Sequence, residues 1–310
     1  MRLKGFNLIC TITFSIIFLF IVNLKLNNSN TIEVYNKNID FYVDAESCIV
    51  MDGYTNEILY QNNPNKKLLP ASITKILTCI TALELYPLDE YVFITNEMIN
   101  TIGSRIYLNI GDYIKVEDLL YGLMLNSGND AAKALALHYS NDEIDFIKQM
   151  NKIANKIKMR NSVFNNPSGL DNENNNITTA YDMALLTSYA LKNKNFTKIF
   201  GAKKHQVTLN DRKLYFYHKH KLVQNYDFVS GGKTGYTEKA GRTLVTVFEG
   251  NNKRIIVVTF NSHNDWQIHI NFGRHFIEDK NDSFQSEISY LPAFMSYKPF
   301  CERLKVIKDD

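Results

Sequence analysis

Leu68–Leu85 reads LLPASITKILTCITALEL, and this mostly apolar stretch predicts a helix that begins near Pro70 and ends before Pro87. Two polar residues stand near its beginning: Ser72 and, one turn later, Lys75. Because residues three apart share a helix face, we expect these two side chains to be neighbours. A lysine is rarely buried unless a partner pairs with it or a site uses it. Taken alone, the pattern fits equally well an N-cap serine beside a lysine that extends to water.

Strand patterns lie on both sides of this helix in the sequence, and further helix patterns lie between them. SCIVMD and EILYQN flank the turn GYTN and predict one hairpin, and RTLVTVFE and RIIVVTFN flank GNNK and predict another. The fold class is therefore α+β, with one antiparallel sheet made from both ends of the chain, flanked by helices, and a helical subdomain inserted between. Besides the helix quoted above, helices are expected over residues 115–125, 130–139, 143–158, 178–191 and 266–277.

The overall composition excludes several function classes. The 310 residues carry a formal net charge of only +3, with basic and acidic residues mixed along the chain, so no nucleic-acid partner is expected. The four cysteines are far apart and form no CxxC pair, so neither a disulfide framework nor a metal site is predicted, and no cofactor is expected. Cys48 and Cys79 are expected to be small buried residues, and Cys10 and Cys301 lie near the two ends.

An apolar stretch near the N-terminus predicts contact with a membrane. Leu8–Leu24 is almost wholly apolar and follows the positive residues Arg2 and Lys4. This arrangement is typical of a secretory signal or of a signal-anchor helix. No small-x-small cleavage pattern follows, which favours an uncleaved anchor. The positive end stays inside, so the body of the protein is expected to be exported.

Two further short stretches gather hydroxyl, amide and amine groups. NSGNDAA places Ser127 and Asn129 at a junction between two predicted helices, where either residue is an ordinary helix cap when taken alone. SGGKTGYT places a Lys-Thr-Gly tripeptide at residues 233–235, just before the second hairpin. This stretch ends like a Walker A phosphate loop, but Asp227 stands where that pattern needs glycine, and strands follow instead of a helix. Nucleotide binding is therefore excluded.

In the order S-x-x-K, S-x-N, K-T-G, the three stretches resemble the motifs of the penicillin-binding-protein and serine β-lactamase superfamily. SGNDAA, KTGYT and the flanking NPSGLD and TTAYDMALL are similar to the low-molecular-weight D-alanyl-D-alanine carboxypeptidases, peptidase family S11, over about residues 44–278. The resemblance implies the β-lactamase and penicillin-binding-protein-like transpeptidase fold. It also implies a serine-type enzyme that removes the terminal D-alanine from peptidoglycan stem pentapeptides through an acyl-enzyme.

The resemblance implies a role for each matching residue. Ser72 would be the acylated nucleophile, and Lys75 would be the base, kept neutral by burial and by the charge of Lys233 nearby. Ser127 would relay a proton to the leaving amine, and Asn129 would hold the substrate's amide. The remaining substrate-binding residues would be Lys233 and Thr234 at the terminal carboxylate, Gly235 leaving space for the substrate along the strand edge, and Tyr236, whose N–H would join that of Ser72 as oxyanion donor.

The resemblance also implies partners and a location. Peptidoglycan stem peptides would be substrates, β-lactams would be covalent inhibitors, and the N-terminal segment would hold the enzyme at the extracytoplasmic face of a bacterial membrane, or release it if cleaved. Four segments are expected: a signal peptide or anchor (1–28), a linker (29–40), a serine D,D-peptidase catalytic domain (41–280) and a C-terminal tail of unknown role (281–310).

Alternatives to the carboxypeptidase stay open at this point. Ser-Gly-Asn in place of Ser-Asp-Asn favours carboxypeptidases over class A β-lactamases, and Glu173 is expected to be solvated, so rapid β-lactam hydrolysis is not expected. A D,D-endopeptidase, a weak β-lactamase, or an inert relative that binds wall peptides would share the same fold. Several other polar residues receive structural predictions only: an exposed salt bridge for Arg242, surface positions for His218 and His220, and helix bracing for Asp130 and Asp182.

Overall fold

The computed structural model describes residues 39, 41–171, 175–210 and 212–278. The predicted N-terminal segment, nearly all of the linker, the C-terminal tail, Cys10, Cys301 and Glu173 lie outside these residues. Within the described part of the chain, no helix is both long and apolar enough to cross a bilayer.

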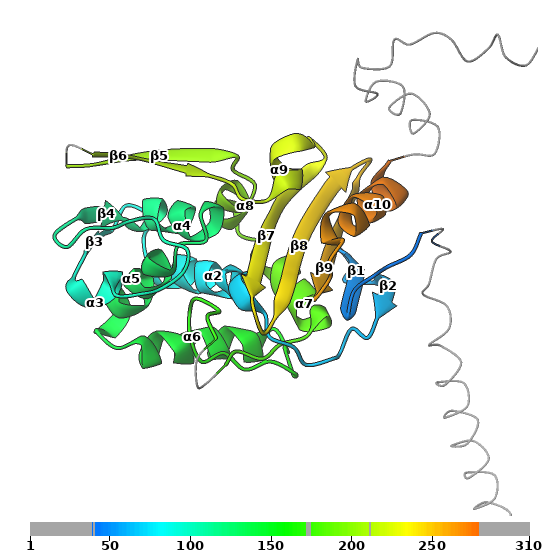
Figure 1. The fold of residues 1–310 in the computed structure, drawn as a ribbon, viewed down its shortest axis with the longest axis horizontal. Coiled ribbons are helices and arrows are strands. Elements are labelled where there is room, and N and C mark those ends of the chain that lie inside the picture. Colours follow the sequence, from blue (N-terminus) through cyan, green and yellow to red (C-terminus); the bar gives the residue numbers. More distant parts are fainter. Residues whose placement is uncertain (1–38, 40, 172–174, 211, 279–310) are drawn as a thin grey trace, which may run out of the picture.

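One five-stranded antiparallel sheet is built from both ends of the described chain, in the order β2-β1-β9-β8-β7 (Figure 1). Strand β1 pairs with β9 so that Ser47 lies opposite Phe260, which confirms the predicted joining of distant segments. Strand β7, which carries the Lys-Thr-Gly tripeptide, lies at one edge of the sheet. The strands are β1 (Ser47–Asp52), β2 (Ile58–Asn62), β7 (Val229–Thr237), β8 (Gly241–Gly250) and β9 (Lys253–Phe260).

Helices cover both faces of this sheet, so its inner strands are buried on both sides. Helices α7 and α8 contact one face, and α9 and α10 contact the other. This explains why β8 and β9 read as continuous apolar runs and not as an alternation. The helices are η1 (Ala71–Thr74), α2 (Lys75–Leu85), α3 (Asn96–Ile99), α4 (Val116–Leu125), α5 (Asn129–Ser140), α6 (Glu143–Lys156), α7 (Ala180–Ala190), α8 (Lys194–Phe200), α9 (Lys221–Asn225) and α10 (Asp265–Ile277).

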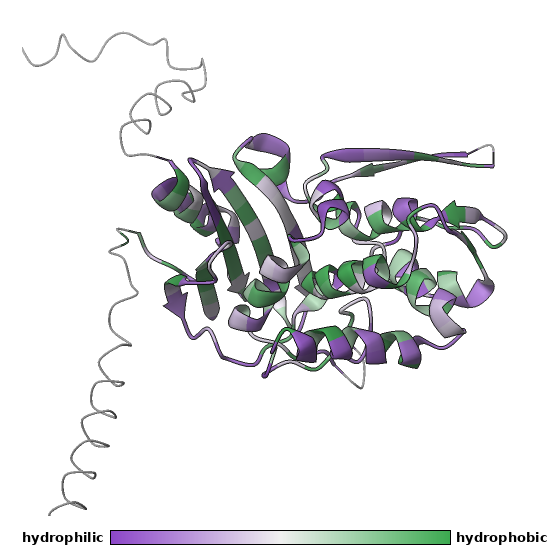
Figure 2. Ribbon diagram, turned by 180° about the vertical axis from the view of Figure 1, so that it is seen from behind, coloured by the Kyte–Doolittle hydropathy of each residue, from purple (hydrophilic) through white to green (hydrophobic). Residues whose placement is uncertain are grey.

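Helix α2 lies at the centre of the helical region, where it contacts α4, α5, α6, α7 and α8. Its residues 75–82 are all buried, which agrees with the apolar stretch that surrounds Ser72 and Lys75 in the sequence. Helix α6 lies at the surface instead, and Figure 2 shows hydrophilic and hydrophobic segments alternating along it. Its buried residues Phe146, Met150 and Ile153 recur at helical spacing on one face.

Two short hairpins were not predicted from the sequence. One joins β3 (Tyr91–Phe93) to β4 (Tyr113–Lys115), and the other joins β5 (Lys204–Leu209) to β6 (Arg212–Tyr217). Both carry exposed tyrosines, and the first has strands of only three residues, so neither gives a clear apolar pattern. The second hairpin ends where the chain turns toward the cleft described below.

Candidate active site

Ser72 lies on a tight turn that several distant segments hold in place. The sequence predicted the first turn of an α-helix here, and the structure places a 3-10 turn, η1, directly before α2. The turn opens with Ala71 in the left-handed region, at φ 48°. From β8, the Thr243 hydroxyl donates to the carbonyl of Pro70 at 2.9 Å. The nucleophile candidate is therefore fixed relative to the sheet as well as to α2.

Lys75 is fully buried and its amine has three oxygen neighbours. Its Nζ lies 2.9 Å from Ser72 Oγ, 2.8 Å from Asn129 Oδ1 and 2.5 Å from the backbone carbonyl of Ser168. Burial, reinforced by the charges of Lys233 and Lys219, holds the pKa of Lys75 well below its usual value, with Asp130 acting in the opposite direction.

The three neighbours match the hydrogen-bonding capacity of a neutral amine. A neutral amine has two N–H donors and one lone pair. The Asn129 and Ser168 oxygens belong to carbonyls, which only accept hydrogen bonds, so they take the two N–H groups. The lone pair is then left facing the Ser72 hydroxyl, which is the arrangement that a general base for this hydroxyl requires.

Ser127 and Lys233 form a second pair beside the first. Ser127 adopts a left-handed backbone, at φ 61°, in the turn before α5, and its Oγ accepts a hydrogen bond of 3.0 Å from Lys233 Nζ. The same amine donates to the carbonyl of Thr234 at 2.9 Å. Burial, and secondarily the charge of Lys219, lowers the pKa of Lys233 to about 7. A non-glycine residue with positive φ costs free energy and is often found at functional sites.

Asn129 is buried, and its amide is engaged at both ends. Its Oδ1 accepts from Lys75, and its Nδ2 donates to the carbonyl of Ile102 at 2.7 Å. These contacts leave only one N–H of the amide for a substrate. Asn129 therefore orients Lys75 directly, in addition to its predicted role at the substrate's amide.

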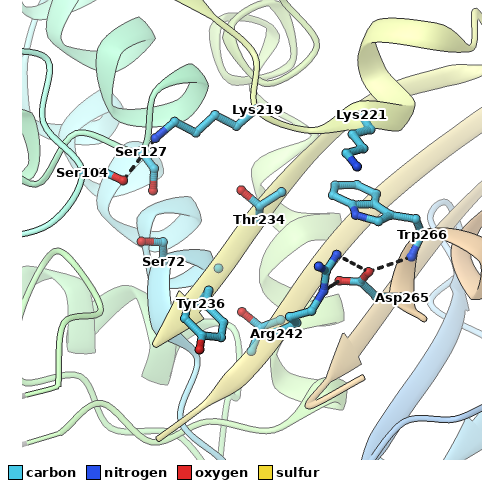
Figure 3. A pocket seen from close by; sticks show the side chains of 12 residues that line it. Ser72, Ser104, Ser127, Lys219, Lys221, Thr234, Tyr236, Arg242, Asp265 and Trp266 are labelled. Carbon is cyan, nitrogen blue, oxygen red and sulfur yellow. Dashed lines mark hydrogen bonds and ion pairs between the residues drawn. The ribbon is translucent and has the colours of Figure 1, made fainter. Parts of the chain in front are cut away.

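Strand β7, which carries the Lys-Thr-Gly tripeptide, packs against the turn that carries Ser72. Gly235 lies so close to η1 that a Cβ there would be 2.3 Å from Thr243 Oγ1 and 2.9 Å from the Ser72 nitrogen. The close approach of η1 and Thr243 therefore already requires a glycine here, and the predicted space for a substrate along the strand edge stays a prediction. Thr234 and the exposed Tyr236 line an open cleft together with Ser72 and Ser127 (Figure 3).

The cleft has further polar residues that the sequence did not single out. Lys219 follows strand β6, and its Nζ donates to Ser104 Oγ at 3.1 Å on the Ser127 side of the cleft. Lys221 and Trp266 lie on the other side, at the start of α9 and of α10 (Figure 3). The only sequence signal for this group was the run HKHKL, in which the histidines drew attention and the lysines did not.

Arg242 was expected in an exposed salt bridge, and its partner proves to be buried. The guanidinium forms two hydrogen bonds to Asp265, of 3.0 and 2.6 Å, and the Asp265 side chain is only 3% exposed. The guanidinium also lies over the Trp266 ring, 5.8 Å from its centroid. Arg242 is therefore held rigidly at the wall of the cleft.

The predicted bracing roles of Asp130 and Asp182 are confirmed. Asp130 accepts hydrogen bonds from the backbone N–H groups of Ile106, Tyr107 and Leu108, and Asp182 accepts from Asn161 N–H and the Ser162 hydroxyl. Cys48 and Cys79 are buried and free, as predicted. Within the described residues, no group of three or more His, Cys, Asp or Glu side chains is arranged to hold a metal ion.

The loop that contains Gly169 packs against Ala71 of η1, and we predict that this glycine is essential for the position of Ser72. Gly169 has φ 81°, and a Cβ there would lie 1.8 Å from the carbonyl oxygen of Ala71. Gly169→Ala should therefore destabilise the fold by about 3 kcal/mol or more and displace Ser72, which urea unfolding and the rate of penicillin acylation will measure.

Gly111→Ala is the matched control for Gly169→Ala. Gly111 has a similar φ of 85°, but a Cβ there meets nothing within 4 Å. It should cost only the backbone strain, about 1–2 kcal/mol, and leave acylation unchanged. Equal losses of stability and of acylation in the two variants would contradict the contact with Ala71.

Comparisons with known proteins identify the family of this chain. The model of the D-alanyl-D-alanine carboxypeptidase family, peptidase family S11, matches residues 33–264. The chain belongs to this family. This match confirms the family resemblance that the motifs predicted, and the solved structure described next confirms the predicted fold.

Relatives in this S11 family extend the comparison. D-alanyl-D-alanine carboxypeptidase DacF of Bacillus subtilis is 35% identical over 225 residues, covering 70% of this chain and 57% of DacF. D-alanyl-D-alanine endopeptidase of Escherichia coli is 31% identical over 228 residues, covering 71% of this chain and 72% of that protein. The crystal structure of a D-alanyl-D-alanine carboxypeptidase from Mycobacterium tuberculosis superposes with a TM-score of 0.70 at 26% identity, covering 74% of this chain and 86% of that one. The chain thus spans little more than half the length of DacF.

Proposed function

We propose that this chain is a serine-type D-alanyl-D-alanine carboxypeptidase that removes the terminal D-alanine from peptidoglycan stem pentapeptides. The observation that carries the proposal is the pairing of Ser72 with a buried amine whose pKa is held well below its usual value. Lys75 Nζ lies 2.9 Å from Ser72 Oγ, and its other two neighbours are carbonyl oxygens.

Acylation uses these groups in order. Lys75 takes the proton of the Ser72 hydroxyl while Oγ attacks the carbonyl carbon of the penultimate D-alanine. The oxyanion that forms is held by the N–H groups of Ser72 and Tyr236. When the C–N bond breaks, Ser127 relays to the amine of the leaving D-alanine the proton that Lys75 took from Ser72, so Lys75 returns to its neutral form and Ser127 keeps its hydroxyl. Water then hydrolyses the Ser72 ester and restores the hydroxyl.

Recognition of a free carboxylate would make the enzyme an exopeptidase. Lys233 and Thr234 stand beside the nucleophile, and Lys219 and Lys221 add positive charge to the walls of the cleft, where the charge of Arg242 is balanced by Asp265. Since the pKa of Lys233 is lowered to about 7, a bound carboxylate would favour its charged form. The same groups would receive the carboxylate of a penicillin, whose β-lactam carbonyl would acylate Ser72.

The proposed location is the extracytoplasmic face of a bacterial membrane. It is supported by the apolar stretch Leu8–Leu24 behind Arg2 and Lys4 in the sequence. Mass spectrometry of the mature N-terminus distinguishes a retained anchor from a cleaved signal.

The test of the proposed reaction is product analysis with a stem pentapeptide. The expected products are one free D-alanine and one tetrapeptide per turnover, and a peptide ending in L-alanine should not be cleaved. A protein that binds the pentapeptide or takes covalent penicillin but releases no D-alanine would contradict the proposal and favour an inert wall-peptide binder.

D,D-endopeptidase activity is the second candidate, because a relative of that activity is 31% identical to this chain over 228 residues. A cross-linked peptide dimer separates the two activities. Faster cleavage of the dimer than of the pentapeptide would make the endopeptidase the main activity.

A further inference from the structure

Two consecutive glycines of β7 are clamped immediately before Lys233. A Cβ on Gly231 would lie 2.3 Å from the Phe200 ring, and a Cβ on Gly232 would lie 2.4 Å from the His220 ring. Neighbouring residues of a strand face opposite sides of the sheet, so the two rings press on β7 from opposite faces. We call Phe200, His220 and the two glycines the ring clamp.

His218 joins the two halves of the ring clamp. Its Nδ1 accepts a hydrogen bond from the backbone N–H of His220 at 3.1 Å. Its other ring nitrogen, Nε2, therefore carries the proton and donates to the carbonyl of Phe200, also at 3.1 Å. The prediction of surface positions was wrong for both histidines, which are 5% and 0% exposed.

The hydrogen bonds of His220 define its tautomer and connect its ring to residues of β8, α10 and β9. Its Nδ1 accepts from the backbone N–H of Val223 and so caps α9. Its Nε2–H then donates to Thr246 Oγ1 at 2.9 Å, and this hydroxyl donates to His269 Nδ1 at 2.7 Å. His269 Nε2–H completes the chain by donating to Thr259 Oγ1 at 2.9 Å. Helix α10 and strands β8 and β9 thus support the ring that presses on Gly232.

The same ring supports a wall of the cleft. The His220 and Trp266 rings meet edge to face, with centroids 4.9 Å apart, and Trp266 lines the cleft next to Arg242 (Figure 3). One imidazole therefore touches both the strand that carries Lys233 and a side chain that lines the cleft.

The arrangement needs a neutral imidazole. A second proton on His220 would place Nδ1–H against the N–H of Val223, two donors facing each other. The titratable groups around it are His218, His269 and Lys233, with the Arg242–Asp265 pair beyond Trp266. Burial holds the pKa of His220 well below its usual value, and the three neighbours act in the same direction.

We propose that His220 is a positioning residue that fixes Lys233 and Trp266 in the cleft through the ring clamp. The proposal rests on the proposed function, because it assigns to Lys233 a role in the reaction. His220 itself lies behind the strand and touches no reacting atom.

His220→Asn is the variant that tests this role. Asparagine is a strong N-cap, so α9 keeps its cap, whereas the contacts with Gly232, Thr246 and Trp266 are lost. We expect kcat/KM for D-alanine release, and the rate of penicillin acylation, to fall about 10- to 100-fold. Measured well below the melting temperature, this loss is separate from any loss of folded protein.

His205→Asn is the matched control. His205 also stacks on an aromatic ring, that of Tyr121, and hydrogen-bonds Asp118, but it lies on the β5–β6 hairpin. It should lower stability without lowering acylation. Equal rates in the two variants and the wild type would overturn the proposal.

Gly232→Ala disturbs the same contact from the strand side, since its Cβ would overlap the His220 ring. The double variant His220→Asn, Gly232→Ala should be no slower than the slower single variant, because both changes act through one contact. Rates that multiply would show that the two residues act independently, and would overturn the ring clamp.

NMR readouts test the clamp without any turnover. In the wild type, the 15N signals of His220 should still report the neutral Nε2–H form at a pH where an exposed histidine has taken up its second proton. In His220→Asn, the pKa of Lys233, followed by 13C-labelled lysine, should rise from about 7 toward its usual value as water enters. An unchanged Lys233 pKa contradicts the positioning role even if the chain proves to have another activity.

Discussion

Lys75→Met is expected to slow the acylation of Ser72 by penicillin by about four to six orders of magnitude. Methionine has nearly the length of lysine and suits a buried site, so the fold should be retained. The change removes the amine nitrogen that lies 2.9 Å from Ser72 Oγ, and with it the lone pair that would accept the proton of the hydroxyl. A reporter penicillin followed by gel fluorescence over hours, with circular dichroism as a check of folding, measures this effect.

Lys148→Met is the control for Lys75→Met. Lys148 pairs with Asp145 on the surface of α6, and its side chain is 68% exposed. It should acylate at the wild-type rate. A Lys75→Met protein within tenfold of the wild type would show that another group takes the proton of Ser72.

Ser72→Ala should abolish covalent labelling completely, since no other hydroxyl has Lys75 as a neighbour among the hydrogen bonds of the described residues. In the wild type, the adduct should be found on the tryptic peptide LLPASITK, which lies between Lys67 and Lys75. Mass spectrometry measures both outcomes.

Ser140→Ala, at the exposed end of α5, controls for Ser72→Ala and should label fully. Persistent labelling of Ser72→Ala, or an adduct on another peptide of the wild type, would remove Ser72 from the role of nucleophile.

Spacing along one helix could be read from the sequence, and contacts across the fold could not. Ser72 and Lys75 were expected to be neighbours because they are three residues apart, and the structure places them so. The carbonyl of Ser168 accepts a hydrogen bond from Lys75, and no local sequence pattern predicts this contact because the two residues are 93 positions apart. Likewise, the predicted sheet followed from apolar strand patterns, whereas the packing of Gly235 against η1 depends on how the sheet meets α2.

The histidines show how a local pattern misleads. His218 and His220 were expected on one exposed strand face because they alternate. In the structure β6 ends at Tyr217, and the chain turns inward so that His220 caps α9. Alternation fixes a face only while the strand continues.

The turn that bears Ser72 depends on strands from the last part of the described chain. Thr243 and Gly235 contact it from strands β8 and β7, which are synthesised long after it, and Lys233 helps to lower the pKa of the Lys75 amine. In a nascent chain still lacking those strands, Lys75 is solvated and protonated, and the serine is an ordinary, unreactive alcohol. We therefore expect the Ser72 hydroxyl to become reactive toward an acyl group only once these strands have folded against its turn.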